Sequence, residues 1–202
     1  MHPCFRPLRV ITPVEWRLAF SRYAMPYPLL CHPSRPCQTP LRLTVGITLT
    51  EAALRLRYRL VGPMNALRIP PLIARAGFGD GLWQHCCFEL FASTVHSKAY
   101  REFNFSPSGQ WAAYAFTDYR ERCVWQPLAA PRIHVETDCE TLEVLIELPQ
   151  LLLPEAMQLQ LGVSAVIESA SGELTYWALN HVGARPDFHR RESFILELAA
   201  NT

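Results

Sequence analysis

The sequence predicts an all-β protein, an antiparallel β-sandwich of about ten strands. Three observations predict this class. Apolar and polar residues alternate with a period of two over several short stretches. Turn-forming Pro, Gly, Asp and Ser residues separate these stretches, and helical periodicity is nearly absent. Many short strands separated by turns are typical of antiparallel sandwiches.

Length and composition are consistent with one domain preceded by an arm. The chain has 202 residues, of which 50% are hydrophobic and 18% are charged, so it can bury a sizeable core. Residues 1–40 hold many of the prolines and show no sustained periodicity. We therefore expect an N-terminal arm or extension at 1–30, outside the core, and a folded domain at 31–202.

The clearest alternation lies between residues 41 and 60. Every second residue from 41 to 49 is apolar, and from 54 to 60 four apolar residues alternate with Arg55, Arg57 and Arg59. Since alternate residues of a strand point to opposite faces, the second stretch predicts one buried face and one solvated row of arginines. Gly62-Pro63 ends this strand. Residues 64–81 form a long loop, a kind of segment that is often functional.

Three further strands are expected within residues 82–119, each with one apolar face. The opposite faces mix carboxylate, amide, imidazole and indole groups. A tight turn at Pro107-Ser108-Gly109 separates the second strand from the third. The polar faces carry Trp83, His85 and Glu89 in the first strand, Tyr100, Glu102 and Asn104 in the second, and Trp111 in the third.

The rest of the sequence predicts two hairpins and a terminal strand. Residues 133–137 and 142–148 pair across residues 138–140, and residues 159–168 and 173–180 pair across Ser171-Gly172. Trp177 and His181 are expected to share one face of the last of these strands. Residues 181–191 are a second long loop, whose PDFHRRE segment folds back over the sandwich. Residues 194–198 end the chain as a strand.

Charge and cysteine content limit the classes of partner. The formal net charge is +1 and the arginines are scattered, so we expect binding to neither nucleic acid nor a membrane. The seven cysteines lack CxxC spacing, which favours reduced thiols and a cytoplasmic location. We find no secretory signal and no stretch long enough to span a membrane. The oligomeric state is not predicted.

Residues 30–198 resemble the bacterial DOMON-like proteins, a superfamily that also includes the family 9 carbohydrate-binding modules. The resemblance implies a jelly-roll-like sandwich that recognises a sugar or haem. The segments that carry it are DGLWQHCCFELF (80–91), YREFNFSPSGQWAAYAF (100–116), YWALNH (176–181) and PDFH (186–189).

Sugar recognition without catalysis is the first functional hypothesis. Flat aromatic rings bind the C–H surface of a pyranose, and polar groups fix its hydroxyls. Burying an unpaired polar group costs roughly a few kcal/mol, so a polar cluster on strands calls for a reason. The alternative is that the tryptophans fill the core and the carboxylates pair with arginines. The predicted ligand-binding residues are Trp83, His85, Glu89, Glu102, Asn104, Trp111, Trp177 and His181.

Haem and calcium remain open as cofactors. DOMON haem proteins ligate iron with a Met and a His, and the resemblance makes Met64 and His181 the corresponding pair in chain order. Paired carboxylates such as Glu89 and Glu102 also occur as calcium ligands. The same pair resembles the two carboxylates of a glycosidase.

Two other classes of function are weighed beside these. His85, Cys87, His181 and His189 carry imidazole and thiolate groups, which bind zinc or copper. A protein-interaction module without a small ligand is the other alternative. GxSxG, P-loop and GxGxxG motifs are absent, so enzymatic activity is not the leading expectation.

Overall fold

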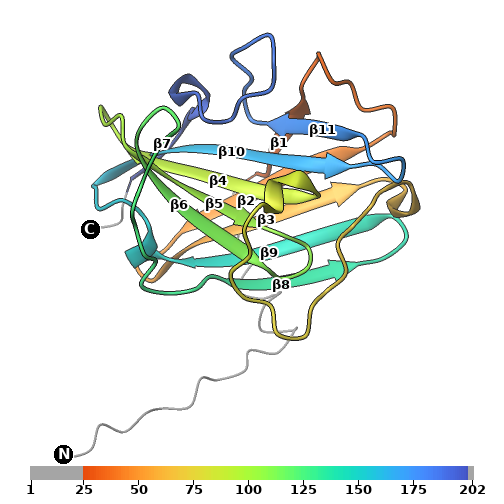
Figure 1. The fold of residues 1–202 in the computed structure, drawn as a ribbon, viewed down its shortest axis with the longest axis horizontal. Helices are drawn as coiled ribbons and strands as arrows, with labels where there is room; N and C mark the ends of the chain where they lie inside the picture. The colour runs from red at the N-terminus through yellow and green to blue at the C-terminus, as the bar shows by residue number, and fades with distance from the viewer. Residues whose placement is uncertain (1–24, 200–202) are drawn as a thin grey trace, which may run out of the picture.

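The computed structural model describes residues 25–199 and shows an all-β protein in which all strand pairs are antiparallel (Figure 1). This confirms the predicted antiparallel β-sandwich. Four short 3₁₀ helices join the strands: η1 (Met64–Ala66), η2 (Leu82–Gln84), η3 (Gln150–Leu152) and η4 (Arg191–Ser193). The twelve strands of the described residues are β1 (Tyr27–Cys31), β2 (Arg42–Leu49), β3 (Ala53–Val61), β4 (Cys87–Thr94), β5 (Tyr100–Phe105), β6 (Trp111–Asp118), β7 (Glu121–Cys123), β8 (Arg132–Thr137), β9 (Thr141–Pro149), β10 (Gln158–Glu168), β11 (Leu174–Ala178) and β12 (Leu196–Ala199).

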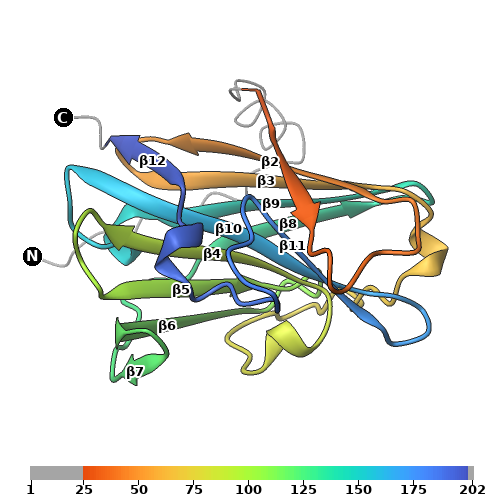
Figure 2. The same cartoon turned by 90° about the horizontal axis from the view of Figure 1, so that it is seen from above.

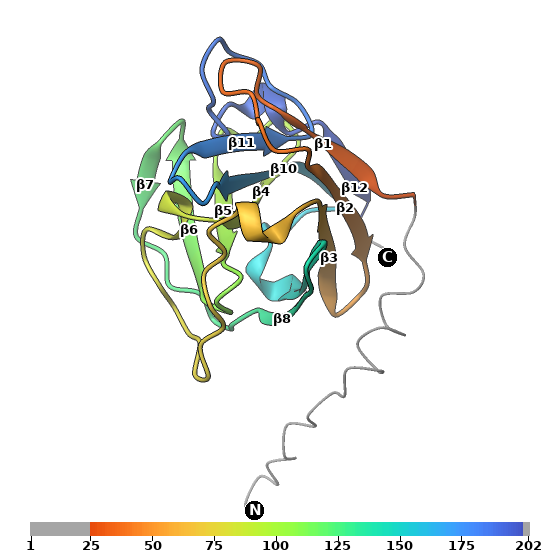
Figure 3. The same ribbon diagram turned by 90° about the vertical axis from the view of Figure 1, so that its right-hand side faces the viewer.

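The strands form two layers that meet at β1. Sheet A has the order β1-β2-β3-β9-β8, and sheet B has the order β7-β6-β5-β4-β10-β11-β1, with β12 paired to β10. Residues 27–29 of β1 pair with β2, whereas Leu30 and Cys31 pair with β11. The strand therefore passes from one sheet to the other, and in Figure 3 β1 and β11 join the two layers at the top.

The position of β1 moves the start of the folded domain. Leu29 is 3% exposed and belongs to the core, so the expected boundary after residue 30 lies inside a strand of the sandwich. Burial of this apolar side chain in the core explains why the segment is structured. The remainder of the expected arm, residues 1–24, lies outside the described residues.

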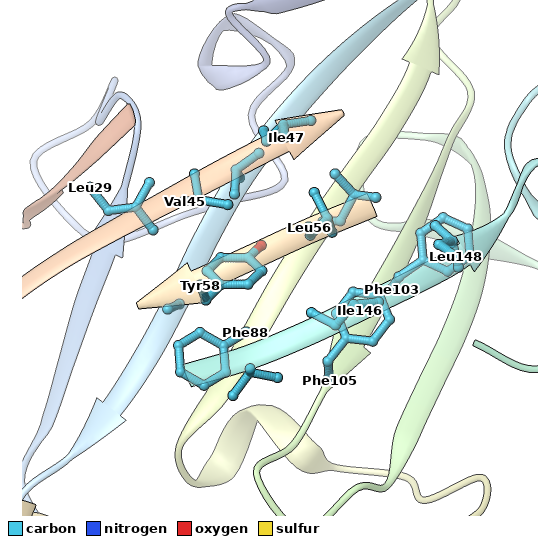
Figure 4. Packing of buried hydrophobic residues seen from close by; sticks show 14 of the residues in the cluster. Leu29, Val45, Ile47, Leu56, Tyr58, Phe88, Phe103, Phe105, Ile146 and Leu148 are labelled. Atoms are coloured by element: carbon cyan, nitrogen blue, oxygen red, sulfur yellow. The ribbon is translucent and has the colours of Figure 1, made fainter. Parts of the chain in front are cut away.

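The hydrophobic core lies between the two sheets, as Figure 4 shows for Tyr58, Phe88 and Phe103. The predicted alternation in β3 is confirmed: Leu54, Leu56, Tyr58 and Leu60 are fully buried. The Tyr58 hydroxyl donates a hydrogen bond to the carbonyl oxygen of Glu89 at 2.7 Å, so the polar atom of this buried ring has a partner.

The predicted turns are confirmed where glycine permits a positive φ. Gly109 has a φ of 84°, and its N–H donates to the carbonyl of Ser106 at 2.9 Å. Gly172 has a φ of 89° between β10 and β11. Such values cost glycine little because it lacks a Cβ atom. The hairpin of β8 and β9 also forms as predicted.

Two strand boundaries differ from the prediction. Residues 82–84 form η2 after Gly81, whose φ is 72°, so the strand begins only at Cys87 and the alternation expected for Trp83 and His85 does not hold. Left-handed backbone at Gly81 cannot continue a strand. At the other end of the sheet, β11 ends at Ala178, and His181 therefore lies in the following loop.

The segment between β11 and β12 positions the site described below. It follows β11, which lies between β10 and β1 in sheet B, and in Figure 2 it crosses over β10 and β4 before reaching β12. This agrees with the prediction that the PDFHRRE segment folds back over the sandwich. Among the described residues, no helix has the length and apolar character needed to cross a membrane.

Candidate functional site

A pocket of about 670 Å³ lies on the face of sheet B that points away from the core, and we call it the outer pocket. Its volume falls within the range of roughly 300–1,000 Å³ that is usual for small-molecule sites. Strands β4, β5, β6 and β10 supply its floor. Its residues are Glu89, Phe91, Glu102, Tyr114, Phe116 and Val166 in the floor, and Trp83, Gln84, Arg120, Arg122, Leu174, Tyr176 and 186–189 in the walls.

Strand register brings the polar side chains of the floor together. Glu89 on β4 stands directly opposite Asn104 on β5 and Ser164 on β10, and directly opposed residues share one face of a sheet. Glu102 lies two residues from Asn104 and therefore points to the same face. Ser164 Oγ donates to the Glu89 carboxylate at 3.1 Å, and Asn104 Nδ2 donates to the Glu102 carboxylate at 2.8 Å.

Both floor carboxyls are buried, with 3% of Glu89 and 6% of Glu102 exposed. Burial raises the pKa of Glu89 to about 8, and the neighbouring Glu102 carboxylate adds to the rise. Burial also raises the pKa of Glu102 to about 7, against the hydrogen bond from Asn104 and the charges of Arg120 and Arg122. Both carboxyls are therefore more readily protonated near neutral pH than a solvated glutamate is. A protonated carboxyl donates a hydrogen bond and an ionised one accepts.

His189 packs over the aromatic end of the floor, with its ring edge-on to Phe116 at 5.2 Å. The Tyr100 hydroxyl accepts from the backbone N–H of Arg120 at 3.0 Å and lies 2.8 Å from His189 Nδ1. If the hydroxyl donates its own proton to Nδ1, the ring proton is on Nε2. Burial, with the Arg120 charge, lowers the pKa of His189 to about 4. The 3.7 Å approach of Nε2 to Glu102 is therefore a contact of a neutral imidazole rather than an ion pair.

Asp187 fastens the covering segment to the β6–β7 turn. Its carboxylate accepts from Arg120 at 3.0 Å and from the Tyr119 hydroxyl at 2.6 Å. The same carboxylate caps its own turn by accepting from the backbone N–H of His189 at 3.2 Å. These bonds, most of them charge-assisted, hold residues 186–189 as a wall of the outer pocket.

Aromatic rings form the other walls. Trp83 is 40% exposed, and its ring meets Tyr114 edge-on with a centroid separation of 5.9 Å. The Arg122 guanidinium lies 4.1 Å from the centre of the Tyr114 ring, within the range of a cation–π contact. Across the pocket, Tyr176 packs against Phe188 at 6.1 Å. Flat apolar surfaces therefore stand beside a polar floor.

The structure brings four of the eight predicted residues together. Trp83, Glu89 and Glu102 line the outer pocket. Asn104 is fully buried and orients the Glu102 carboxylate from below. Since three of these side chains come from adjacent strands, alternation alone was sufficient to group them.

The other four predicted residues lie elsewhere. His85 Nδ1 lies 2.8 Å from a carboxylate oxygen of Glu168, and neither residue lines the outer pocket. Trp111 and Trp177 pack against the core between the sheets, because they fall on the inner faces of β6 and β11. His181 lies in the loop after β11, where Nε2 donates to the carbonyl of Leu30 at 2.8 Å.

Sequence reasoning missed Tyr114, Tyr176, Arg120 and Arg122. The turn at residues 106–110 sets Phe105 opposite Trp111 and Glu102 opposite Tyr114. Paired residues share a face, so this register identifies Tyr114 as the partner of the polar face. Arg120 lies in the turn between β6 and β7, and Arg122 lies in β7; no sequence pattern indicated the position of this turn.

The residues weighed for haem and metal do not gather into one site. Met64 is 6% exposed and belongs to the core between the sheets, whereas His181 contacts Leu30 and the His32 ring. The Cys87 thiol is buried and faces Asn104 at 3.8 Å. Within residues 25–199, no three His, Cys, Asp or Glu side chains form a group that would hold a metal ion.

The fold is that of a carbohydrate-binding-module-like β-sandwich, as three solved structures show. A protein of Bacteroides uniformis described as a "putative carbohydrate-binding protein" matches with a TM-score of 0.65 and 14% identity, covering 93% of this chain and 91% of that one. A family 9 carbohydrate-binding module from Caldicellulosiruptor kristjanssonii in complex with cellotriose matches with a TM-score of 0.59 and 7% identity, over 95% and 86%. A family 9 module from the same organism in complex with glucose gives 0.56 and 8%, over 87% and 84%.

Sequence comparison adds no family assignment. No protein-family model matches the chain, and no curated protein matches it. The resemblance to DOMON-like proteins therefore rests on the sequence segments quoted above.

Proposed function

We propose that the protein binds a carbohydrate or a sugar-bearing metabolite in the outer pocket without converting it chemically. One observation carries the proposal: the buried carboxyls of Glu89 and Glu102 face a pocket whose walls include aromatic rings. Among residues 25–199 no cationic side chain makes a direct ion pair with either carboxyl, and burying two carboxyls in this way opposes folding. Recognition of a ligand that needs both donors and acceptors gives this arrangement a function.

The chemistry of the pocket suits a sugar ring. Trp83 and Tyr176 present flat apolar surfaces to the C–H groups of a pyranose. Beneath them, the raised pKa values of Glu89 and Glu102 favour a protonated carboxyl near neutral pH, so that one carboxyl can donate to a hydroxyl while the other accepts. The neighbouring structures, two of them complexes with cellotriose and glucose, share this fold and direct the choice of ligands to test.

The test is a thermal-shift screen followed by calorimetric titration. The panel contains glucose, cellobiose, cellotriose and other neutral hexoses, with calcium, zinc and haemin as separate arms. A ligand at a hundred times its Kd stabilises a protein by about 2.7 kcal/mol, which raises Tm measurably. We expect a shift with a neutral sugar and its loss in Glu102→Ala.

Glu168→Ala is the matched control. Glu168 is also a buried carboxylate of sheet B, with 3% exposed, but it pairs with Arg68 and His85 outside the outer pocket. We expect Glu168→Ala to retain binding. Equal loss in both variants, or a shift only with haemin or a metal ion, would contradict the proposal.

Hydrolysis of a glycoside is the second candidate. Two carboxyls with pKa values of about 7 and 8 in one pocket are groups able to exchange protons near neutral pH. Incubation with nitrophenyl glycosides distinguishes the two candidates. Turnover that disappears in Glu102→Gln would replace recognition with catalysis as the function of the pocket.

A further inference from the structure

A second hollow of about 570 Å³ adjoins the outer pocket, and we call it the side pocket. Tyr176 and Pro186 line both hollows, so one ligand can extend across this shared edge. The side pocket is formed by two loops, one between β1 and β2 and one after β11. Its residues are Ser34, Arg35, Tyr176, Ala184, Arg185 and Pro186.

The charge of the side pocket differs from that of the outer pocket. Its lining includes two exposed arginines, Arg35 and Arg185, and no carboxylate. The outer pocket also holds two arginines, Arg120 and Arg122, but its lining includes the carboxyl groups of Glu89, Glu102 and Asp187, the last of which pairs with Arg120. Two guanidinium groups around one hollow repel each other, and an anion between them reverses the sign of that interaction. Arginine also matches the planar geometry of phosphate and carboxylate groups.

Two histidines hold the loops that carry these arginines. His32 is 1% exposed, and its Nδ1 accepts from the backbone N–H of Ser34 at 3.1 Å. The proton is therefore on Nε2, which donates to the carbonyl of Gly183 at 3.1 Å. In the other direction, His181 Nε2 donates to the carbonyl of Leu30. The imidazole rings of His32 and His181 meet edge-on with their centroids 4.6 Å apart. Both loops are thus fixed before a ligand arrives, which reduces the entropy lost on binding.

We propose that the ligand is a sugar that carries an oxyanion, with its ring in the outer pocket and its phosphate or carboxylate group in the side pocket. The inference rests on the proposed function of the outer pocket. The floor carboxyls Glu89 and Glu102 disfavour an anion, whereas Arg35 and Arg185 attract one. This separation of charge orients the ligand, with the sugar ring in the outer pocket and the anionic group in the side pocket.

The experiment compares four sugars by calorimetric titration, with inorganic phosphate as a separate arm: glucose, glucose 1-phosphate, glucose 6-phosphate and glucuronate. We expect at least one anionic sugar to bind about tenfold more tightly than glucose, which corresponds to about 1.4 kcal/mol. Raising the salt concentration from 0.05 to 0.5 M should weaken only the anionic ligand, because ions screen exposed charges. Tighter binding of the glucose phosphates alone would identify phosphate as the bound oxyanion, and tighter binding of glucuronate alone would identify carboxylate.

The variant Arg35→Gln/Arg185→Gln should lower the affinity for the anionic sugar to that for glucose and leave glucose binding unchanged. Arg75→Gln, which removes an exposed arginine from the loop before η2, is the matched control and should change neither. Equal affinity for neutral and anionic sugars, or unchanged preference in the double variant, would overturn the inference while leaving sugar binding intact. If no sugar binds, the proposed function is overturned as well. The same conclusion follows if inorganic phosphate binds but no sugar does.

Discussion

The charged side chains on the outer faces of the two sheets differ in their exposure to water: those on sheet A are solvated and paired, whereas the carboxyls on sheet B are buried. On sheet A, Arg57 and Arg59 pair with Glu143 at 2.8 and 3.0 Å, and Arg55 pairs with Glu147 at 3.1 Å. These arginine side chains are 28–49% exposed, so water and opposite charges satisfy them together. The row of solvated arginines predicted from the sequence is confirmed here.

On sheet B the outer face is covered instead of solvated. Glu89 and Glu102 are buried beside Ser164 and Asn104, and segment 186–189 forms a wall above them. Phe194 and Phe91 extend this covered face as a second apolar cluster. The difference teaches that charge on a strand is structural where it is paired in water. Where polar groups on a strand are instead buried beneath a loop, they are candidates for ligand binding.

Among the substitutions that test this comparison, we expect the largest change in stability at Gly162 on β10. A Cβ atom at this position would meet the Phe194 ring at 2.6 Å. We expect Gly162→Ala to destabilise the protein by about 2 kcal/mol, the usual cost of forcing extra volume into a packed region. Denaturant unfolding measures it. Gly77→Ala, where nothing lies within 4 Å of the added atom, should leave stability nearly unchanged, and equal stability of the two variants would show that the outer face of sheet B is not packed.

The next effect is a fall in stability as pH rises from 7 to 8.5. In the unfolded chain both glutamates are ionised throughout this window, whereas the folded protein retains protons because the pKa values of Glu89 and Glu102 are raised to about 8 and about 7. Unfolding therefore releases protons, and each one costs about 1.4 kcal/mol of stability per pH unit. Thermal unfolding across the window measures the slope. The double variant Glu89→Gln/Glu102→Gln should flatten it, and an unchanged slope would exclude these carboxyls as its source.

The smallest effect is expected on sheet A. Glu143→Gln weakens the pairing with Arg57 and Arg59, whose side chains are 39% and 49% exposed, and ion pairs in contact with solvent contribute about 0.2–1 kcal/mol. Unfolding should therefore shift by less than about 1 kcal/mol, and sugar affinity should not change. A loss of sugar binding in this variant would indicate that the binding site lies on sheet A, which would contradict its assignment to sheet B.

Alternation predicted the strands well because one face of each strand packs against the core. It grouped Glu89, Glu102 and Asn104 for the same reason. It assigned Trp111 to the polar face because side-chain polarity was weighed before hairpin register, which places Trp111 opposite Phe105. The physical lesson is that the turn between two strands fixes which residues share a face.

The sequence predicted that the PDFHRRE segment folds back over the sandwich, but it did not predict which side chains the loops bring to the site. Their positions depend on contacts between residues far apart in the chain, such as Arg120 with Asp187 and His32 with Gly183. Local sequence carries no period for such contacts. The expected strand at residues 82–86 failed for a related reason, since Gly81 redirects the backbone into η2 and moves Trp83 into the pocket wall.

The most direct test of the central claim is an NMR titration of the labelled protein with the sugar that gives the largest thermal shift. We predict backbone amide shifts at Glu89, Glu102, Tyr114, Tyr176 and His189, around the outer pocket. We predict none at Arg57 and Glu143 on the opposite face of the molecule. Shifts confined to sheet A, or spread evenly over both sheets, would contradict the assignment of the outer pocket as a sugar-binding site.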